Sequence, residues 1–152
     1  MNEAGESDHA GISLRQQAIR LLARREHTRA ELARKLAGLG TPEEIETVLA
    51  DLEQNGLLSD ARAASAYMRG HAGRFGASRL RQTLRTKGVP AEMIEEQVAE
   101  LPDEIVRARE VWEKKFGTAP RDAREWAKQA RFLQSRGFAT DVIRRLLKEA
   151  AA

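Results

Sequence analysis

The chain has 152 residues, no cysteine and a net charge of +3, so it can bury an apolar core but cannot form a disulfide or a thiolate metal site. Apolar residues make up 41% of it, which argues against disorder, and no apolar stretch approaches the roughly 18–20 residues that a membrane span needs. We therefore expect a cytoplasmic protein with no membrane segment.

The chain begins with a short acidic segment. Residues 1–13 contain three acidic side chains, no Lys or Arg, and no apolar run. A signal peptide would need a basic start followed by an apolar stretch, and this segment has neither. The pattern predicts a disordered acidic tail at 1–13.

Residues 14–58 are expected to form the first group of three helices. Each predicted helix start has a hydroxyl residue followed three positions later by Glu or Gln, which is capping-box spacing: Ser13 with Gln16, Thr28 with Glu31, and Thr41 with Glu44. Apolar residues then recur at helical spacing, as in the stripe Leu32, Leu36 and Leu39. We expect Gly40 to end the second helix in a left-handed conformation.

Residues 59–101 are predicted to form a second, basic group of helices. Leu80 and Leu84 define the inward face of one helix and place Arg81 and Arg85 one turn apart on its outer flank. The run Gly70, Gly73, Gly76 follows a predicted helix instead of a strand and lacks a Gly-Lys-Ser/Thr sequence. We interpret it as an inter-helix turn and not as a phosphate-binding loop.

Residues 102–150 are predicted to form the third group. Trp112 and Trp126 lie in apolar stripes and are expected to be buried. Phe132 lies off the stripe of its helix, so it is expected to pack on the neighbouring group, or else to contact a partner or stack on a base. Arg131 belongs to a basic stripe that faces away from the core.

A repeat of about 48 residues runs through the chain. Gly40, Gly88 and Gly137 are 48 and 49 residues apart, and each follows a Leu by four positions and precedes a short amphipathic helix. No segment alternates as a strand would. The sequence therefore predicts an all-α fold, a tandem array of three three-helix modules at 14–58, 59–101 and 102–150, with an elongated or curved shape.

No residue pattern indicates catalysis or a cofactor. The three histidines are scattered, with no carboxylate or thiol at metal-ligand spacing, and we expect His71 to be a packed or capping residue. No nucleophile has a base at recognisable spacing. We therefore predict a protein that is not an enzyme, with no catalytic residues, no metal site and no cofactor.

The charge distribution is more informative than the net charge. Residues 59–90 carry +6 and residues 121–152 carry +4, while the intervening residues 91–120 carry −4. Two basic blocks favour a polyanionic partner that is met at two places. A solvated, salt-bridged helical surface would give the same distribution, so this alternative stays open.

Three phrases occur in order along the chain: "LLSDARAASAYMR" at 57–69, "GASRLRQTLRTKGVP" at 76–90 and "KQARFLQSRGFATDVIRRLLK" at 128–148. Together they resemble the RecX family of regulatory proteins. The resemblance covers residues 14–150. It implies a monomeric modulator that binds the RecA filament, contacts single-stranded DNA directly or within the filament, and restrains the ATPase, strand-exchange and co-protease activities of RecA.

The resemblance also implies which residues contact the partner. These are the basic residues at matching positions of the second and third modules: Arg81, Arg85, Lys87, Arg131, Arg136 and Arg144. Gly76, Gly88 and Gly137 are expected to serve backbone geometry. The alternative is a helical DNA-binding protein that acts without RecA, although no module offers an evident base-reading set. A general helical adaptor is the third possibility.

Overall fold

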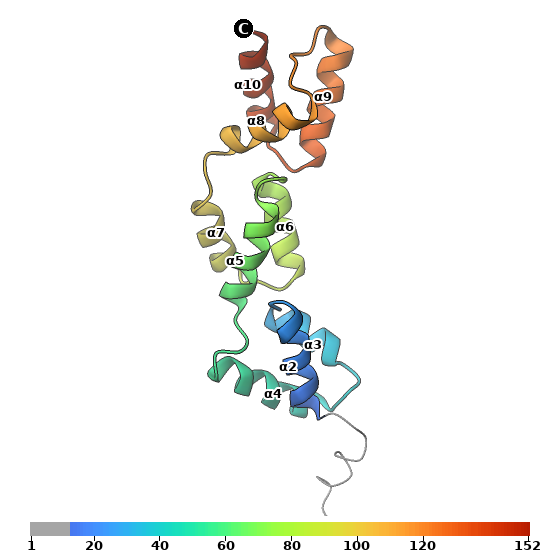
Figure 1. Cartoon of the computed structure of the whole chain (residues 1–152), viewed down its shortest axis with the longest axis vertical. Coiled ribbons are helices and arrows are strands. Elements are labelled where there is room, and N and C mark those ends of the chain that lie inside the picture. The colour runs from blue at the N-terminus through green and yellow to red at the C-terminus, as the bar shows by residue number, and fades with distance from the viewer. Residues whose placement is uncertain (1–12) are drawn as a thin grey trace, which may run out of the picture. The chain divides into compact units, whose positions relative to one another are not determined.

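The computed structural model describes residues 13–152, and over this range the chain is all-α, with nine helices and no strand (Figure 1). The helices are α2 (Leu14–Arg24), α3 (Arg29–Leu36), α4 (Pro42–Gln54), α5 (Asp60–His71), α6 (Ala77–Thr86), α7 (Ala91–Ala99), α8 (Glu104–Lys115), α9 (Ala123–Ser135) and α10 (Thr140–Ala151). The predicted all-α class is confirmed. The predicted acidic tail lies outside the described residues, apart from Ser13, which caps α2.

The described chain forms two compact units, which we treat separately. Unit 1 contains the residues up to Ala64 together with the turn 87–89, and unit 2 contains residues 65–86 and 90–152. Within unit 1, α2, α3 and α4 pack against one another. Within unit 2, α6 packs on α7, and α8, α9 and α10 pack together. None of the described helices is long and apolar enough to cross a membrane.

The three predicted capping boxes are all present in unit 1. Ser13, Thr28 and Thr41 each accept a hydrogen bond from the backbone N–H three residues later, and the side chain of that residue bonds back to the cap. The buried core between the helices consists mainly of leucines: Ala18, Leu32, Leu36, Leu49, Leu52 and Leu58. Local sequence therefore determines where these helices begin and which faces they bury.

The end of α3 differs from the prediction. The chain turns at Gly38, with φ +85°, and not at Gly40, which does not have a positive φ. Because α3 stops at Leu36, Leu39 leaves the helical stripe and is 54% exposed. The expected burial of Leu39 is therefore wrong. The other predicted stops, Gly56, Gly88, Gly117 and Gly137, all have positive φ values.

The turn 87–89 packs closely on the start of α3. The Thr28 hydroxyl donates a hydrogen bond to the Lys87 carbonyl. A Cβ atom on Gly88 would lie only 2.4 Å from Ala30 Cβ, so glycine permits the close approach. The Glu31 carboxylate pairs with Lys87 Nζ at 3.3 Å and with Arg25 Nη2 at 3.0 Å.

Glu31 makes the stability of unit 1 depend on pH. Burial alone would raise its pKa, but the hydrogen bond from the Thr28 N–H and the charges of Arg25 and Lys87 outweigh burial and lower the pKa to about 2. The carboxyl binds its proton more weakly in the folded chain than in the unfolded chain. Its contribution to stability is therefore complete above a pH of about 4.5 and is lost as the pH falls towards about 2.

We expect Glu31→Gln to lower the free energy of unfolding by about 2–3 kcal/mol at neutral pH, since the Glu31 side chain is only 11% exposed. Urea unfolding of the wild type and of Glu31→Gln, from neutral pH down to a pH of about 2, would measure the difference in their free energies of unfolding. This difference should shrink as the pH falls below about 4.5. Glu43→Gln, an exposed carboxylate of α4, is the control and should keep the wild-type pH profile. A constant difference between Glu31→Gln and wild type would contradict this account.

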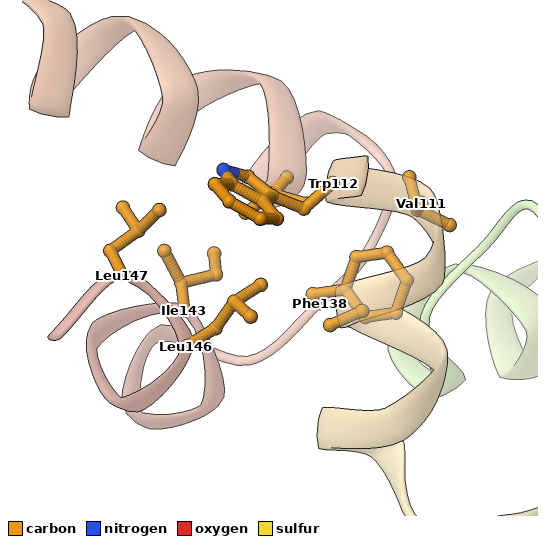
Figure 2. Packing of buried hydrophobic residues seen from close by; sticks show 8 residues of the cluster. Val111, Trp112, Phe138, Ile143, Leu146 and Leu147 are labelled. Carbon is orange, nitrogen blue, oxygen red and sulfur yellow. The ribbon is translucent and has the colours of Figure 1, made fainter. Parts of the chain in front are cut away.

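The third module of unit 2 has a core built from three helices. The buried residues are Ala108, Val111, Trp112, Leu133, Phe138, Ile143, Leu146 and Leu147. Figure 2 shows the Trp112 ring of α8 directed towards Ile143, Leu146 and Leu147 of α10. The Trp112 indole N–H donates to Gln129 Oε1 at 2.8 Å. This hydrogen bond lets the polar Gln129 lie buried on the inner face of α9.

Two aromatic residues of this module differ from expectation. Trp126 is 38% exposed, although it shares the helix face of the buried Gln129 and Leu133, and it lies near the start of α9. The prediction that it is buried is wrong, whereas Trp112 is buried as expected. Phe132 was expected to pack on the neighbouring module, but it packs mainly within its own. It packs against the core of its own module and meets Phe116 edge-on, with ring centroids 5.5 Å apart.

Candidate polyanion-binding surface

The basic residues of unit 1 are largely neutralised by neighbouring acids. Arg29 pairs with both Glu46 and Glu53, and Arg15 pairs with Asp51 at 2.8 Å. These pairs agree with the absence of net charge over residues 14–58. A surface whose charges are already paired attracts a polyanion weakly. The candidate surface must therefore be sought in unit 2.

Two glycines join the start of α6 to the turn between α9 and α10. The Gly76 N–H donates to the Arg136 carbonyl at 2.7 Å. A Cβ atom on Gly76 would lie 2.3 Å from the Gly137 carbonyl oxygen, and one on Gly137 would lie 2.4 Å from Arg79 Cβ. Neither position can hold a side chain without movement of these segments. The expected backbone role of these glycines is confirmed, and it is a contact between two modules.

A buried arginine makes a second contact between the same modules. Arg107 of α8 is 5% exposed, and its guanidinium donates to the backbone carbonyls of Ala72 and Phe75. The Ala72 carbonyl lies at the end of α5, where the helix dipole favours a positive charge. Burial lowers the pKa of Arg107, an effect that Glu104 and Glu110 oppose. This role of Arg107 was not predicted from the sequence.

Three guanidinium groups surround the ring of Phe75, which Arg107 holds in place through its carbonyl. Arg79, Arg74 and Arg136 lie 4.0, 5.4 and 5.8 Å from the ring centroid. Arg136 also lies 5.0 Å from the centroid of Phe132, and Lys115 lies 5.3 Å from it. Each contact at such distances contributes about 0.5–1 kcal/mol when exposed. The two rings therefore gather positive charges at one junction.

Two clefts in unit 2 are lined by cations that contact these rings. The first, which we call the Phe132 cleft, has a volume of about 380 Å³ and is lined by Gly73, Arg74, Val111, Lys114, Lys115, Phe132 and Arg136. The second, which we call the α6 cleft, has a volume of about 460 Å³ and is lined by Ser78, Arg79, Arg81, Gln82, Arg85, Gln134, Ser135 and Gly137. No carboxylate lines either cleft.

Among the cations of the two clefts, only Arg81 is held in an ion pair within the described residues. In the α6 cleft, Arg81 forms a two-pronged pair with Glu95, at 2.9 and 3.2 Å. In the Phe132 cleft, none of the cations forms a salt bridge within residues 13–152: Arg74, Lys114, Lys115 and Arg136. Their charge is available to an anion.

The structure brings some of the predicted site residues together. Arg81 and Arg85 line the α6 cleft, and Arg136 lines the Phe132 cleft. Arg131 and Arg144 are exposed but line neither cleft. Lys87 belongs to unit 1 and pairs with Glu31. Within unit 2, the structure thus brings Arg81 and Arg85 together in one cleft.

Four cations of this surface were not predicted from the sequence: Arg74, Arg79, Lys114 and Lys115. Arg74 lies in a turn, so no helical stripe includes it. Arg79 and Arg136 are 57 positions apart and meet only because the glycine contact joins their segments. The local signal that could have marked the region is the phrase Gly-Arg-Phe-Gly at 73–76, where charge, ring and turn coincide.

The two described histidines, His27 and His71, both pack within the fold. His71 stacks between the rings of Tyr67 and Phe75, with centroid distances of 4.1 and 6.2 Å. This packing agrees with the expectation that His71 is a packed residue. His27 is buried, and its ring nitrogens contact the Arg25 carbonyl and Lys35 Nζ. Across the described residues, no group of three or more His, Asp or Glu side chains could hold a metal ion.

Three models of one protein family match the chain in tandem. They describe the first, second and third three-helix domains of RecX, and they match residues 15–52, 59–96 and 103–147 respectively. Together these matches cover most of the chain, in the same order as the domains of the family.

Curated relatives and a solved structure agree with the family models. The chain is 49% identical to the regulatory protein RecX of Leptothrix cholodnii, covering 93% of this chain and 92% of that protein. It is 44% identical to that of Chromobacterium violaceum, covering 90% of each. The crystal structure of RecX from Lactobacillus salivarius superposes with a TM-score of 0.78 at 21% identity, over 91% of this chain and 94% of that one.

Proposed function

The chain belongs to the RecX family of regulatory proteins, and on this premise we propose that it binds the RecA filament on single-stranded DNA. In this proposal it inhibits the ATPase, strand-exchange and co-protease activities of RecA in the cytoplasm, as a monomer and without catalysis of its own. The observation that carries the proposal is the ordered match of all three domains to one family of regulators.

The charge distribution of unit 2 supports this proposal. A RecA filament on DNA presents phosphates and acidic side chains, and complementary charge accelerates and orients binding to such a partner. Several modest contacts on one chain also act at a high effective concentration, because the second contact forms after the first has bound. We propose that the modules 14–58, 59–101 and 102–150 act together in this way.

We propose that the six basic residues predicted from the sequence contact the filament: Arg81, Arg85, Lys87, Arg131, Arg136 and Arg144. The structure guides which of them to test. Arg81 is paired with Glu95, so its reversal would also disturb α6 and α7. Arg85 and Arg131 are exposed and have no carboxylate partner among the described residues. Reversing these two should alter binding with little change in folding.

We expect the wild-type protein to slow ATP hydrolysis by preformed RecA filaments on single-stranded DNA. For Arg85→Glu with Arg131→Glu, about a tenfold higher concentration should be needed for the same inhibition, because two attractions become repulsions. Arg20→Glu with Arg24→Glu, on the exposed face of α2, changes charge equally and should inhibit as wild type does.

An unchanged RecA rate with the wild-type protein would overturn the proposed function. If that protein nevertheless bound naked DNA tightly, the DNA-binding alternative that acts without RecA would replace it. Equal loss of inhibition in both double variants would show that net charge alone matters, and that the named arginines are not contacts.

A further inference from the structure

The Phe132 cleft holds a concentration of positive charge that the fold does not neutralise. Its four cations, Arg74, Lys114, Lys115 and Arg136, come from two turns and one helix and face no carboxylate in the cleft. Like charges held close together destabilise the protein that carries them. An anion bound in the cleft would offset the repulsion among these cations.

The rings of the cleft position the cations and do not offer a platform of their own. Arg136 contacts the rings of both Phe75 and Phe132, and Lys115 contacts Phe132. Phe75 is buried, and Phe132 is only partly exposed and also meets Phe116. A nucleic-acid base that stacked on Phe132 would have to displace these neighbours. The cleft is therefore built to recognise charge and not a base face.

The same features argue against a protein segment as the ligand. Protein interfaces rely on apolar or aromatic anchors that enter desolvated pockets. Val111 and Phe132 form an apolar wall of the Phe132 cleft, but four of its seven lining residues are Arg or Lys, and two of these cations lie over the Phe132 ring. Interfaces with nucleic acids are more polar and much more positively charged. The many cations of the Phe132 cleft therefore resemble a nucleic-acid interface more than a protein interface.

The cations also continue beyond this cleft. Arg79 and Arg136 contact the same Phe75 ring, and Arg79 lines the α6 cleft together with Arg85. Hydroxyl and amide donors of Ser78, Gln82 and Gln134 lie in the same α6 cleft. A row of charges with neutral donors beside it suits a ligand with regularly repeated charges.

We propose that the Phe132 cleft binds the phosphodiester backbone of single-stranded DNA, without reading its bases. Arg74 and Arg136 supply guanidinium groups that can hold two phosphate oxygens at once, and Lys114 and Lys115 act as point charges. The inference rests on the proposed function in that it names the DNA as a direct ligand, but its test needs no RecA.

The experiment measures binding of the full-length protein to a fluorescein-labelled oligothymidylate by anisotropy, without RecA or nucleotide. Arg74→Glu with Lys114→Glu should weaken binding at least tenfold at low salt. The slope of log affinity against log salt should shrink by about 0.7 for each phosphate that the variant no longer neutralises. An abasic strand of equal length should bind the wild-type protein within about threefold of the oligothymidylate, since the backbone carries the charge.

Two controls separate charge at this cleft from general effects. Arg20→Glu with Arg24→Glu has the same change in net charge and should bind within about threefold of wild type. Arg74→Gln with Lys114→Gln removes the charges without reversing them and should also weaken binding, about threefold or more, with the same reduction in salt slope. Circular dichroism of each variant verifies that helicity is retained, and if the Glu variant unfolds the Gln variant decides the result.

Three outcomes would overturn the inference. They are wild-type affinity in a folded cleft variant, failure of the abasic strand to bind, and competition by polyglutamate as effective as that by the abasic strand. The last outcome would identify an acidic protein segment as the ligand. If the wild-type protein bound DNA but did not inhibit RecA, the proposed function alone would be wrong. If it inhibited RecA but did not bind DNA, only this inference would be wrong.

Discussion

Replacing Gly76 with alanine should lower the free energy of unfolding by about 2–4 kcal/mol. The added Cβ atom would lie 2.3 Å from the Gly137 carbonyl oxygen and 2.6 Å from the Phe138 nitrogen, so it meets backbone that no side-chain rotation can clear. Relief of this overlap requires α6 to move away from the α9–α10 turn. That movement would also break the 2.7 Å hydrogen bond from the Gly76 N–H to the Arg136 carbonyl.

Urea unfolding would measure this effect, and another glycine of the same region provides the matched control. Gly70 lies in the last turn of α5, and a Cβ atom there would meet nothing within 4 Å. Gly70→Ala should therefore stabilise the protein by about 0.5–1 kcal/mol, because alanine favours a helix over glycine. Equal effects of the two substitutions would show that the Gly76–Gly137 contact is not tight.

Replacing Arg107 with methionine should destabilise the protein by about 3–4 kcal/mol. Methionine keeps much of the aliphatic volume of arginine but leaves the carbonyls of Ala72 and Phe75 buried without their donor. An unsatisfied buried acceptor costs about 1–3 kcal/mol, and the helix end also loses a positive charge. Arg107→Lys should recover part of the loss, since an ammonium group restores the charge but has a different donor geometry.

Arg109→Met is the control for Arg107→Met. Arg109 lies on the same helix, two residues further along, but its side chain is 42% exposed and pairs with Glu149. Surface pairs of this kind contribute about 0–1 kcal/mol, so this substitution should have little effect on urea unfolding. If Arg107→Met cost no more than Arg109→Met, Arg107 would not be a structural cap of α5.

The fold could be predicted because its main signals are local. A capping box such as that of Thr28 and Glu31 satisfies backbone donors within four residues, so the sequence alone determines it. The wrong predictions concern positions where tertiary packing determines which of several nearby residues forms the turn or is buried. Gly38 and not Gly40 ends the turn after α3, which exposes Leu39. On α9 the Trp112 indole satisfies Gln129 and lets it lie buried, whereas Trp126, near the start of the same helix, is exposed.

The candidate site could be predicted only in part, because it is assembled from distant segments. Arg136 was identified from a family phrase, but its neighbours Arg79 and Lys115 lie on two other helices. Helical spacing identifies charges that share one helix face. It does not predict which residues of a turn contact a different helix. Arg107 was missed for the same reason, since the carbonyls that it caps are more than 30 positions earlier in the chain.

The contacts of Arg79 and Arg136 with Phe75 have a consequence for the entropy of binding. A free arginine side chain has roughly 2 kcal/mol of rotamer entropy, which it loses when a ligand fixes it. Here the guanidinium groups lie 4.0 and 5.8 Å from the Phe75 ring before any ligand arrives, so part of that loss occurs when the chain folds. An anion that binds beside them meets donors that are already ordered, and it retains more of its interaction energy as affinity.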